Sequence, residues 1–120
     1  MSVPWVSSYY RNVDALDMDS FIASHTDDIR VTFGNNPTAV GKDQVRENIG
    51  QLWSMLNGLK HEFVNVWEPE KDTAVLEARV TYDLKDGRNV TVPSTSILTQ
   101  RSGKIDTLRI YIDMAPVFGG

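Results

Sequence analysis

The sequence predicts one α+β domain shaped like a cone, in which three N-terminal helices pack on a strongly curved, mostly antiparallel sheet. The first half of the chain carries apolar residues at helical spacing, whereas residues 76–84 alternate strictly between apolar and polar side chains. Asp86-Gly87 and Ser102-Gly103 are turn pairs that separate the later strands. In this order of elements the helices precede a meander of strands, which favours an arrangement in which the helices close one face of the sheet.

The first two helices are predicted within residues 4–23. Pro4 suits a first helical turn, because the N–H group that proline lacks has no partner there. Residues 17–20 supply cap oxygens for a second short helix. We expect His25, at the end of that helix, to cap it or to face solvent. Apolar or aromatic residues recur at helical spacing along the first helix: Val6, Tyr9 or Tyr10, Val13 and Leu16.

A short strand over residues 29–33 and a loop over 34–38 precede the clearest amphipathic helix, predicted for residues 42–56. Asn57-Gly58 is a typical helix end. Four strands follow, over residues 61–68, 76–84, 89–100 and 105–113. Alternation on the last strand places Leu108, Ile110 and Ile112 toward the helices.

Composition narrows the function classes. The chain has 120 residues, which predicts a single domain over 1–120, and its net charge of −4 argues against nucleic acid as a partner. With no cysteine it has no thiolate nucleophile, and its two histidines lack metal-site spacing, so we expect neither metal nor other cofactor. The sequence shows no apolar run of membrane-spanning length and no signal-peptide pattern, so we expect a cytoplasmic protein with no membrane partner.

With these elements placed, the chain resembles the nuclear-transport-factor-2-like superfamily, near its SnoaL-like polyketide cyclase and ketosteroid isomerase branch. The resemblance covers residues 6–116 and rests on the order and spacing of short motifs. These motifs are Tyr9 to Phe21, Asp27-Asp28, Gly41, Asp86-Gly87, Gly103-Lys104-Ile105 and Tyr111-Ile112-Asp113. The superfamily contains enzymes, ligand-binding proteins and interaction modules, so the resemblance by itself does not assign an activity.

The resemblance to ketosteroid isomerases implies three site positions. Tyr9 matches the helix tyrosine that donates a hydrogen bond to the substrate oxygen. Phe33 stands where those enzymes have a carboxylate base, and Thr95 stands where they have a second oxyanion acid. Because Phe33 cannot move a proton, we do not expect ketosteroid isomerase activity.

Limonene-epoxide-hydrolase-like relatives have a carboxylate on the last strand, where this chain has Ile110. The last strand therefore predicts an apolar cavity floor. SnoaL-like cyclases resemble the chain more generally, and their chemistry needs an acid or base near the substrate carbonyl. The candidates are His61, as a neutral imidazole, and Asp113, if the end of the strand twists inward.

Two hypotheses follow. The first is a small cofactor-independent SnoaL-like enzyme of the cyclase, isomerase or dehydratase type, acting on a hydrophobic carbonyl-bearing substrate, with Tyr9, His61 and Asp113 as catalytic candidates. The second is a non-catalytic protein of the same fold that binds a small hydrophobic molecule or an interaction partner. Either one uses the same predicted ligand-binding wall: Phe33, Trp53, Val80, Tyr82, Thr95, Ile110 and Ile112. Orientation of His61 toward the cavity and within reach of Tyr9 would favour the enzyme.

The outward face of the predicted sheet mixes charges instead of repeating one sign. Similar members of the superfamily commonly pair through this face, so the resemblance implies a homodimer. The residues expected near the two-fold axis are Arg79, Thr81, Ser94, Ser96, Arg109 and Tyr111.

Overall fold

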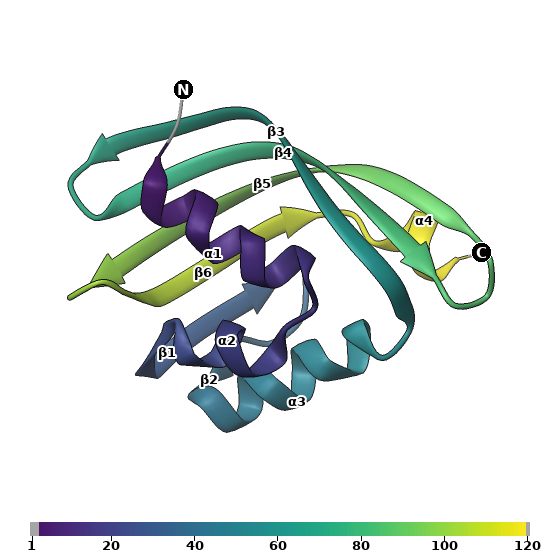
Figure 1. Cartoon of the computed structure of the whole chain (residues 1–120), viewed down its shortest axis with the longest axis horizontal. Coiled ribbons are helices and arrows are strands. Elements are labelled where there is room, and N and C mark those ends of the chain that lie inside the picture. The colour runs from purple at the N-terminus through teal and green to yellow at the C-terminus, as the bar shows by residue number, and fades with distance from the viewer. Residues whose placement is uncertain (1–2, 120) are drawn as a thin grey trace.

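The computed structural model describes residues 3–119 as a curved six-stranded sheet with helices packed against its concave face (Figure 1). The helices are α1 (Pro4–Asp14), α2 (Met18–Ala23), α3 (Lys42–Trp53) and α4 (Ala115–Phe118). The strands are β1 (His25–Phe33), β2 (Ala39–Val40), β3 (Leu56–Glu70), β4 (Thr73–Leu84), β5 (Asn89–Arg101) and β6 (Lys104–Ile112).

The strand order is β2-β1-β6-β5-β4-β3, and every neighbouring pair is antiparallel except β1 with β6, which is parallel. The long strands β3 and β4 arch over the molecule, while α1, α2 and α3 lie along the inside of the curve (Figure 1). The predicted α+β cone is therefore confirmed. The short strand β2 and the C-terminal helix α4 are additions that the sequence patterns did not indicate.

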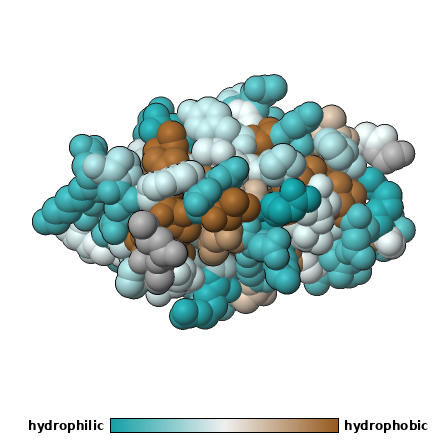
Figure 2. Space-filling model, turned by 90° about the horizontal axis from the view of Figure 1, so that it is seen from above, coloured by the Kyte–Doolittle hydropathy of each residue, from teal (hydrophilic) through white to brown (hydrophobic). Residues whose placement is uncertain are grey.

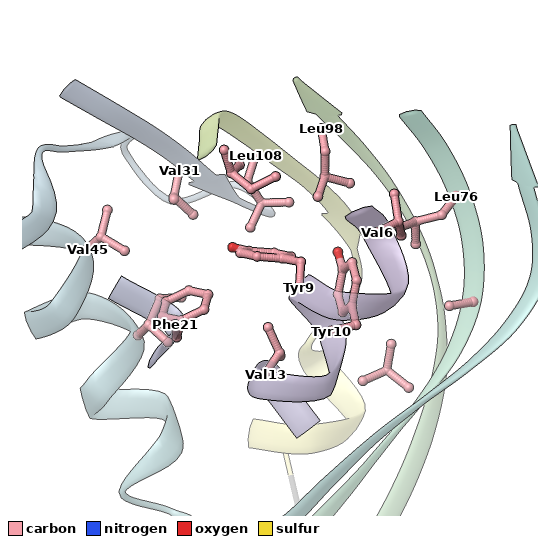
Figure 3. Packing of buried hydrophobic residues seen from close by; sticks show 14 of the residues in the cluster. Val6, Tyr9, Tyr10, Val13, Phe21, Val31, Val45, Leu76, Leu98 and Leu108 are labelled. Atoms are coloured by element: carbon pink, nitrogen blue, oxygen red, sulfur yellow. The ribbon is translucent and has the colours of Figure 1, made fainter. Parts of the chain in front are cut away.

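Local chemistry explains where α1 and α2 begin. Pro4 occupies the first turn of α1. The side chain of Asp17 caps α2 by accepting a hydrogen bond of 3.2 Å from the backbone N–H of Ser20. Both helices turn their apolar side toward the sheet, and Figure 3 shows Tyr9 and Tyr10 leaving α1 on that side, with Phe21 of α2 facing Tyr9.

The third helix is shorter than predicted. It ends at Trp53, and Leu56 instead begins β3, where it pairs with Leu84 of β4. Leu56 is 4% exposed, so it is buried in either conformation, and helical periodicity could not distinguish the end of the helix from the start of the strand.

Strand β5 corrects the predicted face assignment. Ser94 and Ser96 are 6% and 2% exposed and lie on the concave side, because their cross-strand partners Ala78 and Leu76 are themselves buried there. The placement of these two serines on the outward face was therefore wrong. Small polar side chains on both faces of β5 hide the alternation that is plain in β4.

None of the helices in residues 3–119 is both long enough and apolar enough to cross a lipid bilayer.

Candidate active site

A small cavity lies between the helices and the concave face of the sheet. Its volume is about 50 Å³, which is room for one or two water molecules. Its wall draws on three helices and five strands, and most of it is apolar. The lining residues are Tyr9, Tyr10, Val13, Phe21, Phe33, Ile49, Leu52, Trp53, Leu59, His61, Val80, Tyr82, Ser96, Leu108, Ile110 and Ile112.

The structure brings most of the predicted site residues to this wall. Tyr9 and His61 are both there, but they are not hydrogen-bonded to each other within residues 3–119, so only the first of the two conditions set for His61 is met. Six members of the predicted ligand-binding set line the same wall: Phe33, Trp53, Val80, Tyr82, Ile110 and Ile112. Their roles in binding and catalysis stay predictions. Thr95 is the exception, since it is exposed on the outer face and its neighbour Ser96 lines the cavity instead. The placement of Thr95 was wrong for the same reason as that of the two serines.

Asp113 does not join Tyr9 and His61. It follows the end of β6, is exposed, and accepts a hydrogen bond of 2.9 Å from the backbone N–H of Ala115 through Oδ1. The chain beyond β6 turns into α4 and does not twist the carboxylate inward. Asp113 lines a separate open groove and is absent from the cavity wall.

His61 is instead paired with Asp14, the last residue of α1. Its Nδ1 atom lies 2.6 Å from Oδ1 of Asp14, and its backbone N–H donates to Oδ2 of the same carboxylate at 2.9 Å. The two side chains are 12% and 30% exposed, respectively. The ring of Tyr10 packs on the imidazole, with 4.7 Å between ring centres. One carboxylate therefore holds both the backbone and the ring of His61.

This pairing selects a tautomer. A carboxylate only accepts hydrogen bonds, so Nδ1 of His61 carries a proton and donates it to Asp14. In the neutral ring Nε2 then has a free lone pair, and within residues 3–119 it has no hydrogen-bond partner. An Asp-oriented imidazole with a free Nε2 is the arrangement of a general base.

Asp14 was not among the predicted site residues. The signal that would have indicated it is its spacing from Tyr10: four residues along a helix place both side chains on one face, at the edge of the cavity. Nothing in the sequence pairs Asp14 with His61, because 47 positions separate them and only the packing of α1 on β3 brings them together.

Tyr9 is hydrogen-bonded to the second histidine. Its hydroxyl oxygen lies 2.7 Å from Nε2 of His25, which is fully buried at the start of β1. The expectation that His25 caps a helix or faces solvent was wrong, because α2 ends at Ala23 and the chain enters the sheet at His25 itself. Burial foremost, with a smaller effect of Lys42, lowers the pKa of His25 from 6.5 to about 4, so its ring is neutral at pH 7.

A neutral imidazole has one N–H group, and the partners of His25 indicate where it lies. Nδ1 is buried and has no hydrogen-bond partner in the described part of the chain. Buried N–H donors without partners are rarer than unpaired acceptors. We therefore assign the proton to Nε2, which donates to the Tyr9 hydroxyl oxygen. The hydroxyl proton of Tyr9 then remains free to be donated to a ligand.

The tyrosines that line the cavity are donors and not bases. Burial is the largest cause that raises the pKa values of Tyr9, Tyr10 and Tyr82, all above their usual range. Their phenols stay protonated at neutral pH. Among the residues on the cavity wall, this leaves the imidazole of His61 as the group equipped to accept a proton.

An open groove of about 930 Å³ adjoins the cavity. The two share Phe33, Ile49, Leu52 and Ile112, so the groove leads to the cavity wall. Its other sides are the loop between β1 and β2, the exposed side of α3 and the segment that contains α4. Within residues 3–119, no three His, Asp or Glu side chains are grouped as metal ligands would be.

Comparison with known proteins gives the family of this chain. The profile of the SnoaL-like domain matches residues 6–107. The chain belongs to the SnoaL-like domain family. A comparison with curated proteins finds no significant match for this SnoaL-like chain.

Solved structures with the same fold are distant in sequence. A protein from Catenulispora acidiphila with a ketosteroid isomerase-like fold, in complex with trimethylamine, matches with a TM-score of 0.86 at 14% identity, over 99% of this chain and 92% of that one. A candidate SnoaL-like polyketide cyclase from Jannaschia sp. CCS1 matches with a TM-score of 0.77 at 22% identity, over 98% of this chain and 93% of that one. The epoxide hydrolase/cyclase-like enzyme SalBIII acts in pyran ring formation in salinomycin. It matches with a TM-score of 0.81 at 16% identity, over 93% of this chain and 90% of that one. At these identities the likeness shows the fold.

Proposed function

We propose that this SnoaL-like domain is a cofactor-independent enzyme of the cyclase, isomerase or dehydratase type that moves a proton on a hydrophobic carbonyl-bearing substrate. The observation that carries the proposal is the His61–Asp14 pair on the wall of an apolar cavity. Polyketide cyclase and epoxide cyclase relatives with the same fold support it. Because the cavity is small, the substrate occupies it together with the adjoining groove.

Each polar group has one role in this proposal. Nε2 of His61 removes a proton from the carbon next to the substrate carbonyl, while Asp14 orients the ring and stabilises the imidazolium that forms. Tyr9 donates its hydroxyl proton in a hydrogen bond to the carbonyl oxygen, where negative charge develops. His61 then returns the proton to the substrate. Asp113 has no part in these steps, because its carboxylate lies outside the cavity.

The alternative is a non-catalytic protein that binds a small hydrophobic molecule. The observation that favours it is the apolar side of the wall: Phe33 and Ile110 line the cavity at the positions where the related isomerases and epoxide hydrolases have carboxylates. In this alternative the His61–Asp14 pair stabilises the packing of α1 on β3 and transfers no proton.

Deuterium exchange at the α-carbon of 2-tetralone, a bicyclic ketone, separates the two functions without knowledge of the natural substrate. Binding is measured first by calorimetry, and exchange in D₂O is then followed by NMR. We expect exchange above the buffer rate and a loss of roughly 10²–10⁴-fold in His61→Ala, the range for removal of a general base. Tyr9→Phe should lose roughly 10²–10³-fold, as for one oxyanion donor.

Asp14→Asn is the sharper variant, because it keeps the size of the side chain. The Asn amide would donate to Nδ1, which forces the ring proton onto Nε2 and removes the base. Asp19→Asn is the matched control, since Asp19 pairs with Arg46 on the surface. Binding of 2-tetralone with equal exchange in the wild type and in His61→Ala would refute catalysis and support the binding protein.

We also propose that two copies pair through the convex face of the sheet, as the sequence predicts. Trp67, Val75 and Ile97 are successive cross-strand neighbours on this face, and Arg109 continues the row. Trp67 is 45% exposed and Tyr111, on the same face, is 56% exposed. Figure 2, which looks onto the side where β3 and β4 arch, shows hydrophobic residues gathered in the middle among hydrophilic ones. Apolar residues exposed together favour an interface.

Sedimentation at micromolar concentration tests the pairing. We expect a dimer for the wild type and a monomer for Ile97→Lys, because a lysine in the middle of the row would be desolvated without a partner. Asn89→Lys, at the exposed start of β5, is the control and should remain dimeric. A wild-type monomer would contradict the proposal.

A further inference from the structure

The groove beside the cavity has an unusual wall on α3. Gln44, Asn48 and Gln51 line the groove and are spaced four and three residues apart, so they form one stripe along the helix. All three have carboxamide side chains. Across the groove, the loop between β1 and β2 adds two more carboxamides, Asn35 and Asn36.

The charged residues of α3 are kept away from this stripe. Lys42, Asp43, Arg46 and Glu47 all lie outside the residues that line the groove. Lys42 pairs with Asp27 at 3.4 Å, and Arg46 pairs with Asp19 at 3.1 Å. A helix with four charged residues therefore presents no charged group to the groove, only carboxamides and the apolar Ile49 and Leu52.

The carboxamides have spare hydrogen-bonding capacity. Oε1 of Gln44 accepts from the backbone N–H of Val40 at 2.8 Å, which leaves its NH₂ group free. Within residues 3–119, the side chains of Asn35, Asn36, Asn48 and Gln51 make no hydrogen bond. Each carboxamide offers two donors and an acceptor, so it suits a group that both donates and accepts, such as a hydroxyl.

The remaining sides of the groove are apolar or already paired. Asp113 is the one charged residue on the described lining, and its Oδ1 already accepts from Ala115. The α4 segment is held in place, since Val117 is fully buried and its carbonyl accepts from Nη2 of Arg88 at 2.8 Å. A groove with an uncharged, hydrogen-bonding wall on α3 and one carboxylate, that of Asp113, thus continues from an apolar cavity.

We infer that the ligand of this protein is amphipathic: an apolar ring system that packs where the groove meets the cavity, against the apolar wall that the two share, and an uncharged, hydroxyl-bearing extension, such as a sugar or polyol, that lies in the groove against the carboxamides of α3. This inference names the substrate class of the proposed function and rests on it in taking the cavity wall as the place of the apolar part. An anionic extension would give up water without an opposite charge to meet it, and a cationic one would find only the carboxylate of Asp113, away from the carboxamides of α3.

Four probes that share a naphthyl ring test the inference: 2-naphthol, 2-naphthyl β-D-glucoside, 2-naphthyl sulfate and 2-naphthylmethylamine. Dissociation constants are measured by calorimetry. We expect the glucoside to bind about 10-fold or more tightly than 2-naphthol, as one or two net hydrogen bonds would give. The sulfate should bind no better than 2-naphthol, and the amine, which can meet only Asp113, should bind less tightly than the glucoside.

The variant Asn48→Ala/Gln51→Ala should reduce the affinity for the glucoside to that for 2-naphthol. Alanine favours the helix, so the change should not unfold α3. Asp43→Ala/Glu47→Ala is the matched control on the same helix, away from the groove, and should keep the preference for the glucoside.

Three results would overturn the inference: a glucoside that binds no better than 2-naphthol, a sulfate or an amine that binds more tightly than the glucoside, or no binding by any probe. The readout is equilibrium binding and needs no proton transfer. A preference for the glucoside in a protein that exchanges no ketone proton would therefore support the groove and refute only the catalytic proposal.

Discussion

The two histidines of this chain end in opposite environments, although both lie within reach of helix α1. His25 is fully buried at the start of β1, and its partner is the neutral hydroxyl of Tyr9. The side chain of His61 is 12% exposed on the cavity wall, and its partner is the carboxylate of Asp14. The first has a neutral partner and is shielded from solvent. The second has a charged partner and access to the cavity.

This difference separates a structural imidazole from one equipped for chemistry. Without a counter-charge, His25 stays neutral and serves as a fixed donor that orients Tyr9. In the proposed reaction, Asp14 stabilises the positive charge on His61 while that ring holds the proton of the substrate. The partner and the degree of burial decide the role, since the side chain is the same.

The largest expected effect that sharpens this comparison is on stability at acidic pH. The folded state lowers the pKa of His25 from 6.5 to about 4, so the unfolded chain binds more protons between these two values. The free energy of unfolding therefore falls as the pH drops from 6.5 toward 4, with a contribution from His25 of about 3 kcal/mol. Below pH 4 the folded state is protonated too, and this contribution changes no further.

Urea denaturation at pH 7, 6, 5 and 4.5 measures this effect against the other titrating groups. His25→Gln should flatten the acid-side decrease by the contribution of His25, because glutamine does not titrate and its amide reaches the position of Nε2, where it can still pair with Tyr9. His61→Asn is the matched control and should keep the part of the decrease that His25 causes. The same slope in the wild type and in His25→Gln would contradict a buried neutral His25.

A smaller effect is expected from loss of the Tyr9 hydroxyl. Tyr9→Phe leaves the Nε2–H group of His25 buried without an acceptor, which should cost roughly 1–3 kcal/mol of unfolding free energy. Tyr111→Phe removes the hydroxyl of a tyrosine that is 56% exposed and should change stability by less than about 0.5 kcal/mol. Equal stability of the two variants would show that the Tyr9–His25 hydrogen bond contributes nothing.

The parts of the fold that were predicted are those encoded locally. The strict alternation of residues 76–84 is confirmed by β4, in which residues on one face are buried from Ala74 to Leu84. The apolar stripe of α1 places Tyr9 in the core, as its spacing predicts. Each pattern lies within one element, where the period of the backbone sets the direction of every side chain.

The wrong predictions fall at positions where the local sequence pattern either gives no signal or fits two kinds of element. Leu56 fits a helix stripe and a strand start equally well, and the small polar residues around Thr95 give no alternation to follow. His25 lies at a junction between helix and strand, where neither period applies. At each of these positions, burial against a distant strand decided the outcome.

The sequence by itself determined the element types, the α+β class and the family, because hydrophobic period, turn residues and motif order are all properties of neighbouring positions. Only the tertiary structure decided which histidine meets a carboxylate. Asp14 and His61 are 47 positions apart, and β3 must bend along α1 before the two can touch. A hydrogen bond acts over about 3 Å, so its partners are set by packing in space and not by order along the chain.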